Sequence, residues 1–426
     1  MVQKKLEMRI YSFFIAGIAF FMLGVVYYLI QKMPTRFTTE SIHEVISNRQ
    51  LVSLNLSSFL KKNEYPEQMN LLWKDSAVLG NIKYTLSTSL QKEAEKLLNL
   101  YKPDYGALFA MDATTGRVLA MASYERHAET PINYNLQATF PAASLFKIVT
   151  ASAAIDKAGL QPAHRIRYNG GAYTLYRKNV MTDKITRWTN VISLKDAFAR
   201  SINTAFGRIT LENLEPSDIA HYADRFMFNQ YIPSDFPVEE GTAYVPDEKG
   251  FELTEVASGY NKKNRISPVQ GAMIAAAIAN DGIMLIPTIV DSITNVNNSD
   301  VLYEHSPVTA GEIISVESAK KIRELMNSTV VSGTSRKSFY PLLKNRKFQD
   351  VEMGGKTGHL TGDKPRGRVD WFIGYAYDQD QKIALAALTI NKEFWTVKSS
   401  FLGKSLIKSH FTESFHIANQ NKNEDE

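Results

Sequence analysis

The sequence predicts an α+β fold in which a single N-terminal transmembrane helix precedes an antiparallel sheet flanked by helices, with an inserted helical subdomain. Three observations support this prediction. A long uncharged apolar run lies near the N-terminus, two strand hairpins lie far apart in the remaining chain, and long apolar helices lie between them. Strands on both sides of a helical middle region indicate one discontinuous domain rather than a row of small ones.

Length and composition are those of an ordinary globular protein. The 426 residues are 44% hydrophobic and 22% charged, which excludes a wholly disordered or collagen-like chain. The net charge of +5 is too small and too scattered to indicate a nucleic-acid-binding protein. Cysteine is absent, so disulfides, thiolate catalysis and cysteine-ligated metal centres are excluded.

The apolar run, residues 10–30, contains no charged residue. A helix of this length covers ~30 Å, the thickness of the hydrocarbon core of a bilayer. A cleaved signal peptide or a buried core helix are the alternatives, but no small-x-small cleavage site follows the run. Lys4, Lys5 and Arg9 precede it, which predicts a single-pass protein of the inner (cytoplasmic) membrane with residues 1–9 in the cytoplasm and the main domain periplasmic or extracytoplasmic.

The expected elements beyond the span follow from periodicity and from turn residues. They are a stalk or small membrane-proximal region at 31–80, a helix at 90–101, a hairpin at 105–123, helices at 144–158 and 268–280, a hairpin at 371–390, a helix at 401–417 and a disordered tail at 416–426. The main domain is expected to cover 81–415.

A serine and a lysine one helical turn apart, Ser144 and Lys147, form the first candidate pair. An apolar run follows them, which places the pair at the first turn of a buried helix. A serine hydroxyl needs a base within hydrogen-bond reach to act as a nucleophile, and a lysine serves only if burial or a neighbouring cation lowers its pKa. Ser-x-x-Lys occurs at five places, but only Ser144 introduces a buried apolar helix; elsewhere a helix-surface pair is the better interpretation.

Two further elements place polar groups where a substrate could be held. Ser201 and Asn203 could point a hydroxyl and an amide into one cleft, although a helix cap explains Ser-x-Asn equally well. Lys356, Thr357 and Gly358 form the only Lys-Thr-Gly in the chain, where glycine lets a substrate backbone approach a strand edge. A phosphate-binding loop is rejected because the glycine that it requires is replaced by aspartate at position 350.

Taken together and in this order, the three elements resemble those of the penicillin-binding transpeptidases. Further segments carry the same resemblance: GALFAMDATTGRVLAMAS, PAASLFKIVTASAAI, SLKDAFARSINTAFGR, ISPVQGAMIAAAIANDGIMLIPTIV and WFIGYA. The resemblance covers residues 81–415 and implies a penicillin-binding transpeptidase domain there.

The resemblance implies that the chain is a serine-type D-Ala-D-Ala transpeptidase that cross-links peptidoglycan stem peptides and binds penicillin covalently. It makes Ser144 the nucleophile and Lys147 its base. Ser201 and Lys356 would pass the proton to the leaving nitrogen, and Asn203 would hold the substrate amide.

Around the substrate carboxylate, the resemblance assigns binding positions to Thr357, Gly358 and His359. The backbone N–H groups of Ser144 and His359 would stabilise the developing oxyanion. The family usually has threonine or serine at the position of His359, so carboxylate recognition through a hydroxyl is in question there. A protonated imidazole that binds the carboxylate and a bystander side chain are both open.

Several alternatives remain open from the sequence. A class D-like β-lactamase would share the fold, but Asn203 favours the penicillin-binding side; a D,D-carboxypeptidase would share the acyl-enzyme, and a non-catalytic anchored scaffold would need a failed active centre. The chain has no room for a glycosyltransferase domain between residue 31 and residue 81. We predict no cofactor and no metal, and as partners peptidoglycan stem peptides, β-lactams, a membrane and cell-wall synthesis proteins, but no nucleic acid.

Overall fold

The computed structural model describes residues 39–424. Two compact units divide the chain, residues 1–47 and residues 48–426, and each is considered by itself. Of the first unit, the structure describes only the initial turns of helix α2 (Thr39–Leu60). The description below concerns the second unit, which contains all the candidate residues.

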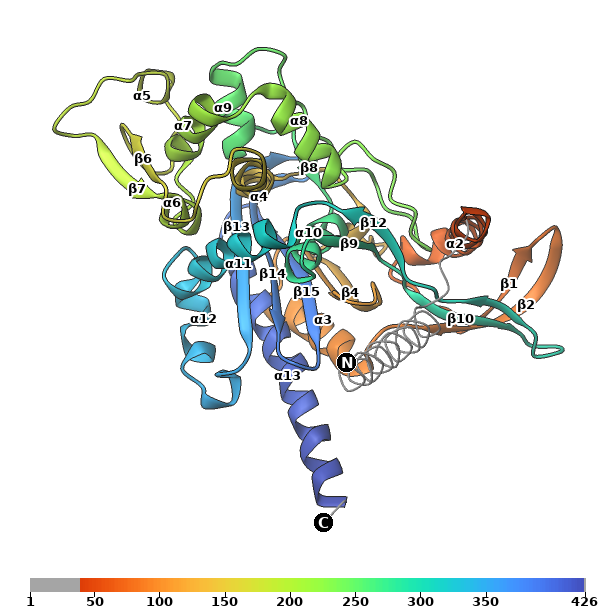
Figure 1. The fold of residues 1–426 in the computed structure, drawn as a ribbon. Coiled ribbons are helices and arrows are strands. Elements are labelled where there is room, and N and C mark those ends of the chain that lie inside the picture. The colour runs from red at the N-terminus through yellow and green to blue at the C-terminus, as the bar shows by residue number, and fades with distance from the viewer. Residues whose placement is uncertain (1–38, 425–426) are drawn as a thin grey trace, which may run out of the picture. The chain divides into compact units, whose positions relative to one another are not determined.

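A five-stranded antiparallel sheet forms the centre of this unit, in the order β13-β14-β15-β3-β4 (Figure 1). The strands are β3 (Tyr105–Asp112), β4 (Val118–Glu125), β13 (Glu352–Asp363), β14 (Arg366–Tyr377) and β15 (Lys382–Asn391). The hairpin β3–β4 thus pairs with the hairpin β14–β15, through β3 and β15, with Ile383 opposite Asp112. This pairing makes one domain of segments that lie more than 250 residues apart.

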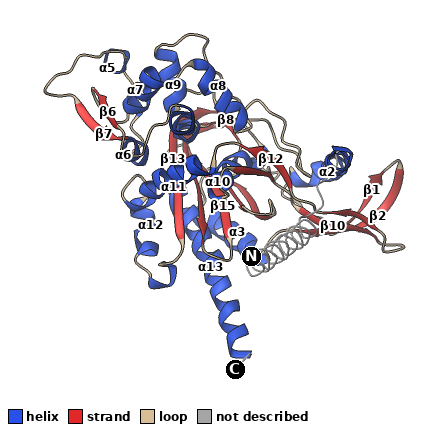
Figure 2. Ribbon diagram, in the orientation of Figure 1, coloured by secondary structure: helices blue, strands red, loops and turns tan. Residues whose placement is uncertain are grey.

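Both faces of the sheet are covered, as the blue helices around the red strands in Figure 2 show. Because side chains alternate along a strand, Phe109 packs with the cluster around α10 (Pro268–Ala279), whereas Leu108 packs with the cluster that includes α3 (Thr88–Tyr101) and α13 (Ser399–Glu424). Helix α11 (Val316–Val331) packs on β13, and α12 (Arg336–Leu343) lies between α11 and α13.

A helical region is inserted between β4 and β13 in the sequence. It contains α4 (Lys147–Ser152), α5 (Arg177–Val180), α6 (Leu194–Ala199), α7 (Asn203–Asn213), α8 (Pro216–Arg225) and α9 (Phe251–Ser258), with three short 3-10 or π segments, η1 (Tyr134–Leu136), η2 (Ala143–Phe146) and η3 (Ala153–Lys157). Two small ribbons belong to it, β5 (Phe140–Pro141) with β8 (Arg265–Ile266), and β6 (Arg165–Tyr168) with β7 (Asn190–Ser193). The remaining turn, η4 (Arg346–Phe348), precedes β13.

Outside the central sheet, a second antiparallel sheet has the order β1-β2-β10-β11, and β9 pairs with β12. Their bounds are β1 (Gln68–Trp73), β2 (Ser76–Tyr84), β9 (Ile283–Ile286), β10 (Val290–Asn295), β11 (Val301–Glu304) and β12 (Val308–Glu312). The β1–β2 hairpin lies partly within the range predicted as a stalk, and α13 continues into the range predicted as a tail. The domain limits of 81–415 stay a prediction.

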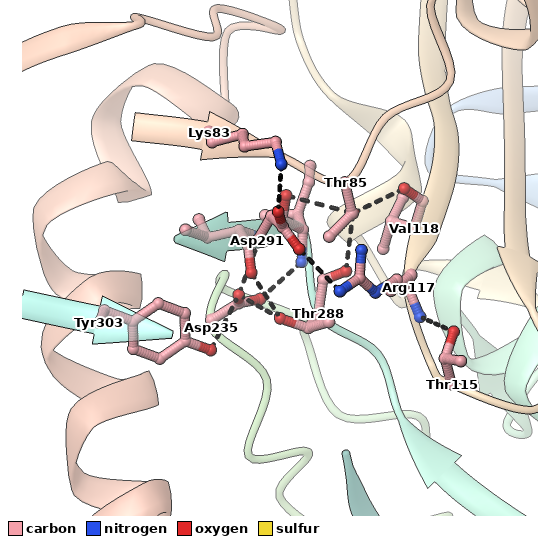
Figure 3. Close-up of polar contacts among 11 residues, drawn as sticks. Lys83, Thr85, Thr115, Arg117, Val118, Asp235, Thr288, Asp291 and Tyr303 are labelled. Atoms are coloured by element: carbon pink, nitrogen blue, oxygen red, sulfur yellow. Dashed lines mark hydrogen bonds and ion pairs between the residues drawn. The ribbon is translucent and has the colours of Figure 1, made fainter. Parts of the chain in front are cut away.

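A buried carboxylate, Asp235, ties the loop after α8 to the start of β10 (Figure 3). Its oxygens accept hydrogen bonds from the backbone N–H groups of Ile289 and Val290 at 2.8 and 3.0 Å and from the Thr288 hydroxyl at 2.5 Å. Burial raises the pKa of the Asp235 carboxyl, and Arg49 together with these donors opposes that rise. The network is dense enough to hold the second sheet against the core.

The predicted hairpins at 105–123 and 371–390 and the helix at 268–280 correspond to β3–β4, β14–β15 and α10. The predicted helix at 144–158 differs, because it is divided into η2, α4 and η3, which have 3-10, α and π geometry in turn. The tight 3-10 turn is what brings Ser144 and Lys147 together, as described below.

The transmembrane part of the predicted fold class is corrected. Within residues 39–424, no helix is both long enough and apolar enough to cross a bilayer. The apolar helix α10 has only 12 residues, ~18 Å of helix, and is wholly buried in the core, whereas the longer α13 carries Lys404 and Lys408. The predicted span at 10–30 lies outside the described residues. The fold class that the structure supports is the α+β domain.

Candidate active site

Ser144 lies in the tight turn η2, where strand β5 gives way to α4. The preceding residue, Ala143, has φ +48°, a left-handed conformation that is uncommon for a residue with a Cβ. Gly259 packs against this turn, and a Cβ on Gly259 would lie 1.8 Å from the carbonyl oxygen of Ala143. Glycine at 259 therefore allows the close approach that fixes the backbone on which Ser144 is carried.

Lys147 is fully buried, and its ammonium nitrogen meets three oxygen atoms. The nitrogen lies 2.9 Å from Ser144 Oγ, 2.7 Å from Asn203 Oδ1 and 2.5 Å from the carbonyl oxygen of Ser258. None of these partners carries a negative charge. The lysine is therefore held in place by directional contacts but its charge is not neutralised by a carboxylate.

Lys356, on β13, is the second buried cation of the site. Its nitrogen donates to Ser201 Oγ at 2.9 Å and to the carbonyl oxygen of Thr357 at 2.9 Å. Burial lowers the pKa of Lys356 to about 7. Burial first, and the Lys356 ammonium second, hold the pKa of Lys147 well below its usual value. Two buried cations without an anion thus favour the neutral, basic form of Lys147.

Ser201 and Asn203 reach the site from the junction of α6 and α7. Ser201 has φ +57°, a second left-handed residue with a Cβ, and this turn directs its hydroxyl to Lys356. Asn203 lies at the start of α7, where its Oδ1 accepts from Lys147 and its Nδ2 donates to the Tyr173 carbonyl at 2.8 Å. Strained backbone at two positions of one cleft is typical of a functional site.

Thr357 and Gly358 lie in a buried stretch of β13, the edge strand of the central sheet. Thr357 Oγ1 lies 2.6 Å from Thr334 Oγ1, which belongs to the turn between α11 and α12. A Cβ on Gly358 would make ordinary contacts with Ala142, Ala143 and Leu145, so β13 runs directly beside the Ser144 turn. Strand β13 with its Thr357 hydroxyl, the Thr334 hydroxyl and the Ser144 turn therefore lie next to one another.

His359 is held differently from the other predicted residues. Its Nε2 contacts the buried carboxylate of Asp370 on β14, and its ring stacks on Trp395 with centroids 5.3 Å apart. Asp370 also accepts a hydrogen bond from the Ser399 N–H at 2.8 Å. The imidazole is 43% exposed but its polar edge is directed to Asp370. A carboxylate contact from His359 stays a prediction.

The geometry brings together five of the predicted residues: Ser144, Lys147, Ser201, Asn203 and Lys356. A hydroxyl next to a neutral amine can attack a carbonyl, and a second hydroxyl–lysine pair can return the proton. Within the described residues, no cluster of three metal-ligating side chains occurs. This arrangement of hydroxyls and amines is suited to acyl transfer by a serine.

The sequence model of the penicillin-binding protein transpeptidase domain matches residues 106–406. The chain belongs to this family. The matched range contains every residue of the site described above.

Curated proteins and solved structures resemble this transpeptidase over most of its chain. Peptidoglycan D,D-transpeptidase PbpA of Mycolicibacterium smegmatis is 24% identical over 351 residues, which are 72% of this chain and 67% of that protein. Stage V sporulation protein D of Bacillus subtilis is 23% identical, and the match covers 70% of this chain but 47% of that protein. The crystal structure of PBPA from Mycobacterium tuberculosis has a TM-score of 0.62 at 23% identity and covers 78% of this chain and 80% of that one.

Three side chains of the transpeptidase site were not predicted from the sequence: Thr334, Asp370 and Trp395. Thr334 follows a glycine in a polar loop, with no periodicity to mark it. Asp370 was hidden inside an apolar strand, where a lone acid is unusual because burying a carboxylate is costly. That buried acid, opposite His359 in the β13–β14 hairpin, is the one signal from which the His359 contact could have been found.

Proposed function

We propose that Ser144 of this D,D-transpeptidase attacks the carbonyl carbon of the penultimate D-Ala of a stem peptide. The Ser144 proton passes to Lys147 as the oxygen–carbon bond forms. The carbon–nitrogen bond then breaks, the nitrogen of the terminal D-Ala takes a proton delivered through Ser201 and Lys356, and D-Ala leaves. The backbone N–H groups of Ser144 and His359 hold the oxyanion in this proposal.

The second half of the reaction uses the same groups in reverse. An amine of a neighbouring stem peptide loses its proton to the base, attacks the ester carbonyl and releases Ser144, which regains a proton. The product is a new amide cross-link. Because stem peptides are cross-linked outside the cytoplasm, we place the domain's activity in the periplasmic or extracytoplasmic space.

The observation that carries the proposal is the position of Lys147, which lies 2.9 Å from Ser144 Oγ in a buried site without a carboxylate. A lysine there costs stability as a cation, and the lowered pKa makes its neutral amine available as a base. Thr357 and Thr334 present two hydroxyls at the strand edge, and these can bind the carboxylate of the terminal D-Ala or of a β-lactam. This pair gives the site a carboxylate contact that does not depend on the His359 side chain.

The test uses the full chain and a fluorescent penicillin, with labelling followed on gels and by intact mass. We expect one long-lived adduct per chain and none in Ser144→Ala. Ser405→Ala is the matched control, because Ser405 also begins a Ser-x-x-Lys sequence but its hydroxyl donates to the Phe401 carbonyl within α13. Label that persists in Ser144→Ala would contradict the proposal.

A second assay follows the natural reaction, with a stem pentapeptide as donor and an amino acid amide as acceptor. We expect D-Ala release and formation of the amide product. Rapid hydrolysis of penicillin would indicate a β-lactamase instead, and D-Ala release without transfer to any amine would indicate a carboxypeptidase.

A further inference from the structure

A projecting arm, residues 169–189, connects β6 to β7 and carries the short helix α5 (Figure 1, upper left). Five large apolar or aromatic side chains in the arm are exposed: Tyr173, Tyr176, Met181, Ile185 and Trp188. Trp188 is 73% exposed and Tyr173 is 67% exposed. Five exposed large apolar side chains within one short segment make this arm a candidate binding surface.

The arm also has an excess of positive charge. It carries Arg177, Lys178, Lys184 and Arg187 against a single acid, Asp183, which is bound by Arg208 at 2.6 Å. In the described part of the chain, no carboxylate pairs with any of the four cations. The guanidinium of Arg187 lies over the Trp188 ring at 4.8 Å, so charge and aromatic face are presented together.

Hydrogen bonds within the outer part of the arm define its conformation. The Thr189 hydroxyl donates to Asn169 Oδ1 at 2.8 Å and accepts from the Thr186 N–H at 2.9 Å. The backbone N–H of Trp188 donates to the Thr186 hydroxyl at 3.1 Å. Asn169 Nδ2 donates to the Lys184 carbonyl at 3.1 Å. These contacts hold the tip in one conformation, which lowers the entropic cost of binding a ligand there.

The inner end of the arm is attached to the active centre. Asn203 donates from its backbone N–H to the Ala172 carbonyl at 2.9 Å and from its Nδ2 to the Tyr173 carbonyl at 2.8 Å. The same Asn203 contacts Lys147. A chain molecule lying along the arm would therefore deliver one of its groups to the cleft at Ser144, from the side formed by α7 rather than from the edge of β13.

We propose that the arm binds the acceptor strand of peptidoglycan during cross-linking, an inference that rests on the proposed function. Sugar rings of the strand stack on Trp188 and on neighbouring apolar groups, and carboxylates of its stem peptides pair with Lys184 and Arg187. The free edge of β13 remains for the donor peptide, which can add to it as a further strand. The arm contacts Asn203, which in turn contacts Lys147. This connection favours a substrate strand as the ligand over a nucleic acid or an anionic membrane surface.

The experiment compares Lys184→Glu/Arg187→Glu and Trp188→Ala with wild type in the full chain. The matched controls are Arg346→Glu/Lys347→Glu and Tyr340→Ala, which change exposed cations and an exposed aromatic ring around α12 and η4. Three quantities are measured: sedimentation with insoluble peptidoglycan, cross-link yield on a linear un-cross-linked peptidoglycan, and the rate of penicillin acylation.

We expect the double charge reversal to weaken binding to peptidoglycan about tenfold at low salt, with a smaller loss at high salt because exposed charges are screened. Cross-link yield should fall in step in both arm variants, while acylation by penicillin proceeds at the wild-type rate. The controls should bind and cross-link as wild type does.

The proposal would be overturned by arm variants that bind and cross-link normally while acylation is intact, and the proposed function would then stand. An equal loss in the controls would overturn it as well, as would loss of acylation in both arm variants, because the arm would then be part of the fold of the active centre. Binding to anionic vesicles and to a single-stranded oligonucleotide is measured as well. Arm variants that lose binding to either of these, but bind peptidoglycan as wild type does, would assign the arm to another partner. Absence of acylation in wild type would instead reject the proposed function.

Discussion

Two buried charged regions of this molecule are constructed in opposite ways. Around Asp235, a carboxylate receives two backbone N–H groups and a threonine hydroxyl, with Arg49 nearby. Around Lys147, a buried ammonium meets oxygens of neutral groups only, and the nearest charged group is another cation, Lys356. The first region surrounds its buried acid with hydrogen-bond donors and a cation, and the second leaves its buried cation without a counter-ion.

The difference separates a structural charge from a reactive one. A buried acid with enough donors links distant segments and adds to stability, whereas two adjacent buried cations favour loss of a proton. The reactivity proposed for Ser144 would depend on this local arrangement of two cations, which is unfavourable in a purely structural site. Substitutions in the two regions should therefore change different measurements.

The largest effect is expected for Lys147→Met. Methionine fills a similar volume without a base, so the rate of penicillin acylation should fall about 10³-fold or more. Because a buried uncompensated cation is removed, the melting temperature should stay the same or rise. Acylation kinetics and thermal unfolding check both parts, and a variant that melts well below wild type would contradict the distinction between the two regions.

The opposite result is expected for Asp235→Ala. The change leaves the backbone N–H groups of Ile289 and Val290 without an acceptor, and we expect a loss of about 3 kcal/mol in the free energy of unfolding. Asp235→Asn keeps one acceptor oxygen and should lose less. Denaturant titrations measure the stability, and the acylation rate per folded molecule should be unchanged. A specific loss of acylation in the folded protein would join Asp235 to the active centre.

The pH dependence of stability distinguishes the regions by sign. Lys356 has its pKa lowered from 10.5 to about 7, so between these values the unfolded chain holds more protons than the folded one. Stability contributed by Lys356 is present above pH 10.5 and is lost as the pH falls through about 7, with a slope of at most about 1.4 kcal/mol per pH unit. Asp235 has the opposite sign, since its raised pKa makes stability decrease as the pH rises through it. The free energy of unfolding should therefore vary less with pH between pH 7 and pH 10 in Lys356→Met than in wild type.

The grouping of the candidate residues was largely predictable from the sequence, because each pair or triplet has a short spacing; their catalytic roles stay a proposal. Ser144 with Lys147, Ser201 with Asn203, and the Lys-Thr-Gly strand each occupy a few adjacent residues, and the family resemblance gives their order. The left-handed turns at Ala143 and Ser201 were not predictable, since long-range packing, such as that of Gly259 on the Ala143 carbonyl, imposes them. Sequence gave no sign of the division of residues 144–158 into three helix types.

The smallest effect is expected for His359→Thr. This change tests the His359–Asp370 pair, which differs from both buried regions because its imidazole is half-exposed. Asp370 would keep the Ser399 N–H but lose its contact with the imidazole, so we expect a loss of about 1.5 kcal/mol in the free energy of unfolding. Acylation by penicillin should stay within about threefold of wild type, because Thr357 and Thr334 remain. A loss of more than tenfold would show that the His359 side chain acts directly on the carboxylate.

The sheet order determines when a growing chain can first react. Strand β3 is made early, but its partner β15 and the strand that carries Lys356 lie more than 200 residues later in the sequence. The contribution of the Lys356 ammonium to the lowered pKa of Lys147, which is second to that of burial, therefore cannot form until β13 has been made and has joined the sheet. Chains that end before β13 carry Ser144 without Lys356. We therefore expect such truncated products to remain unreactive toward penicillin.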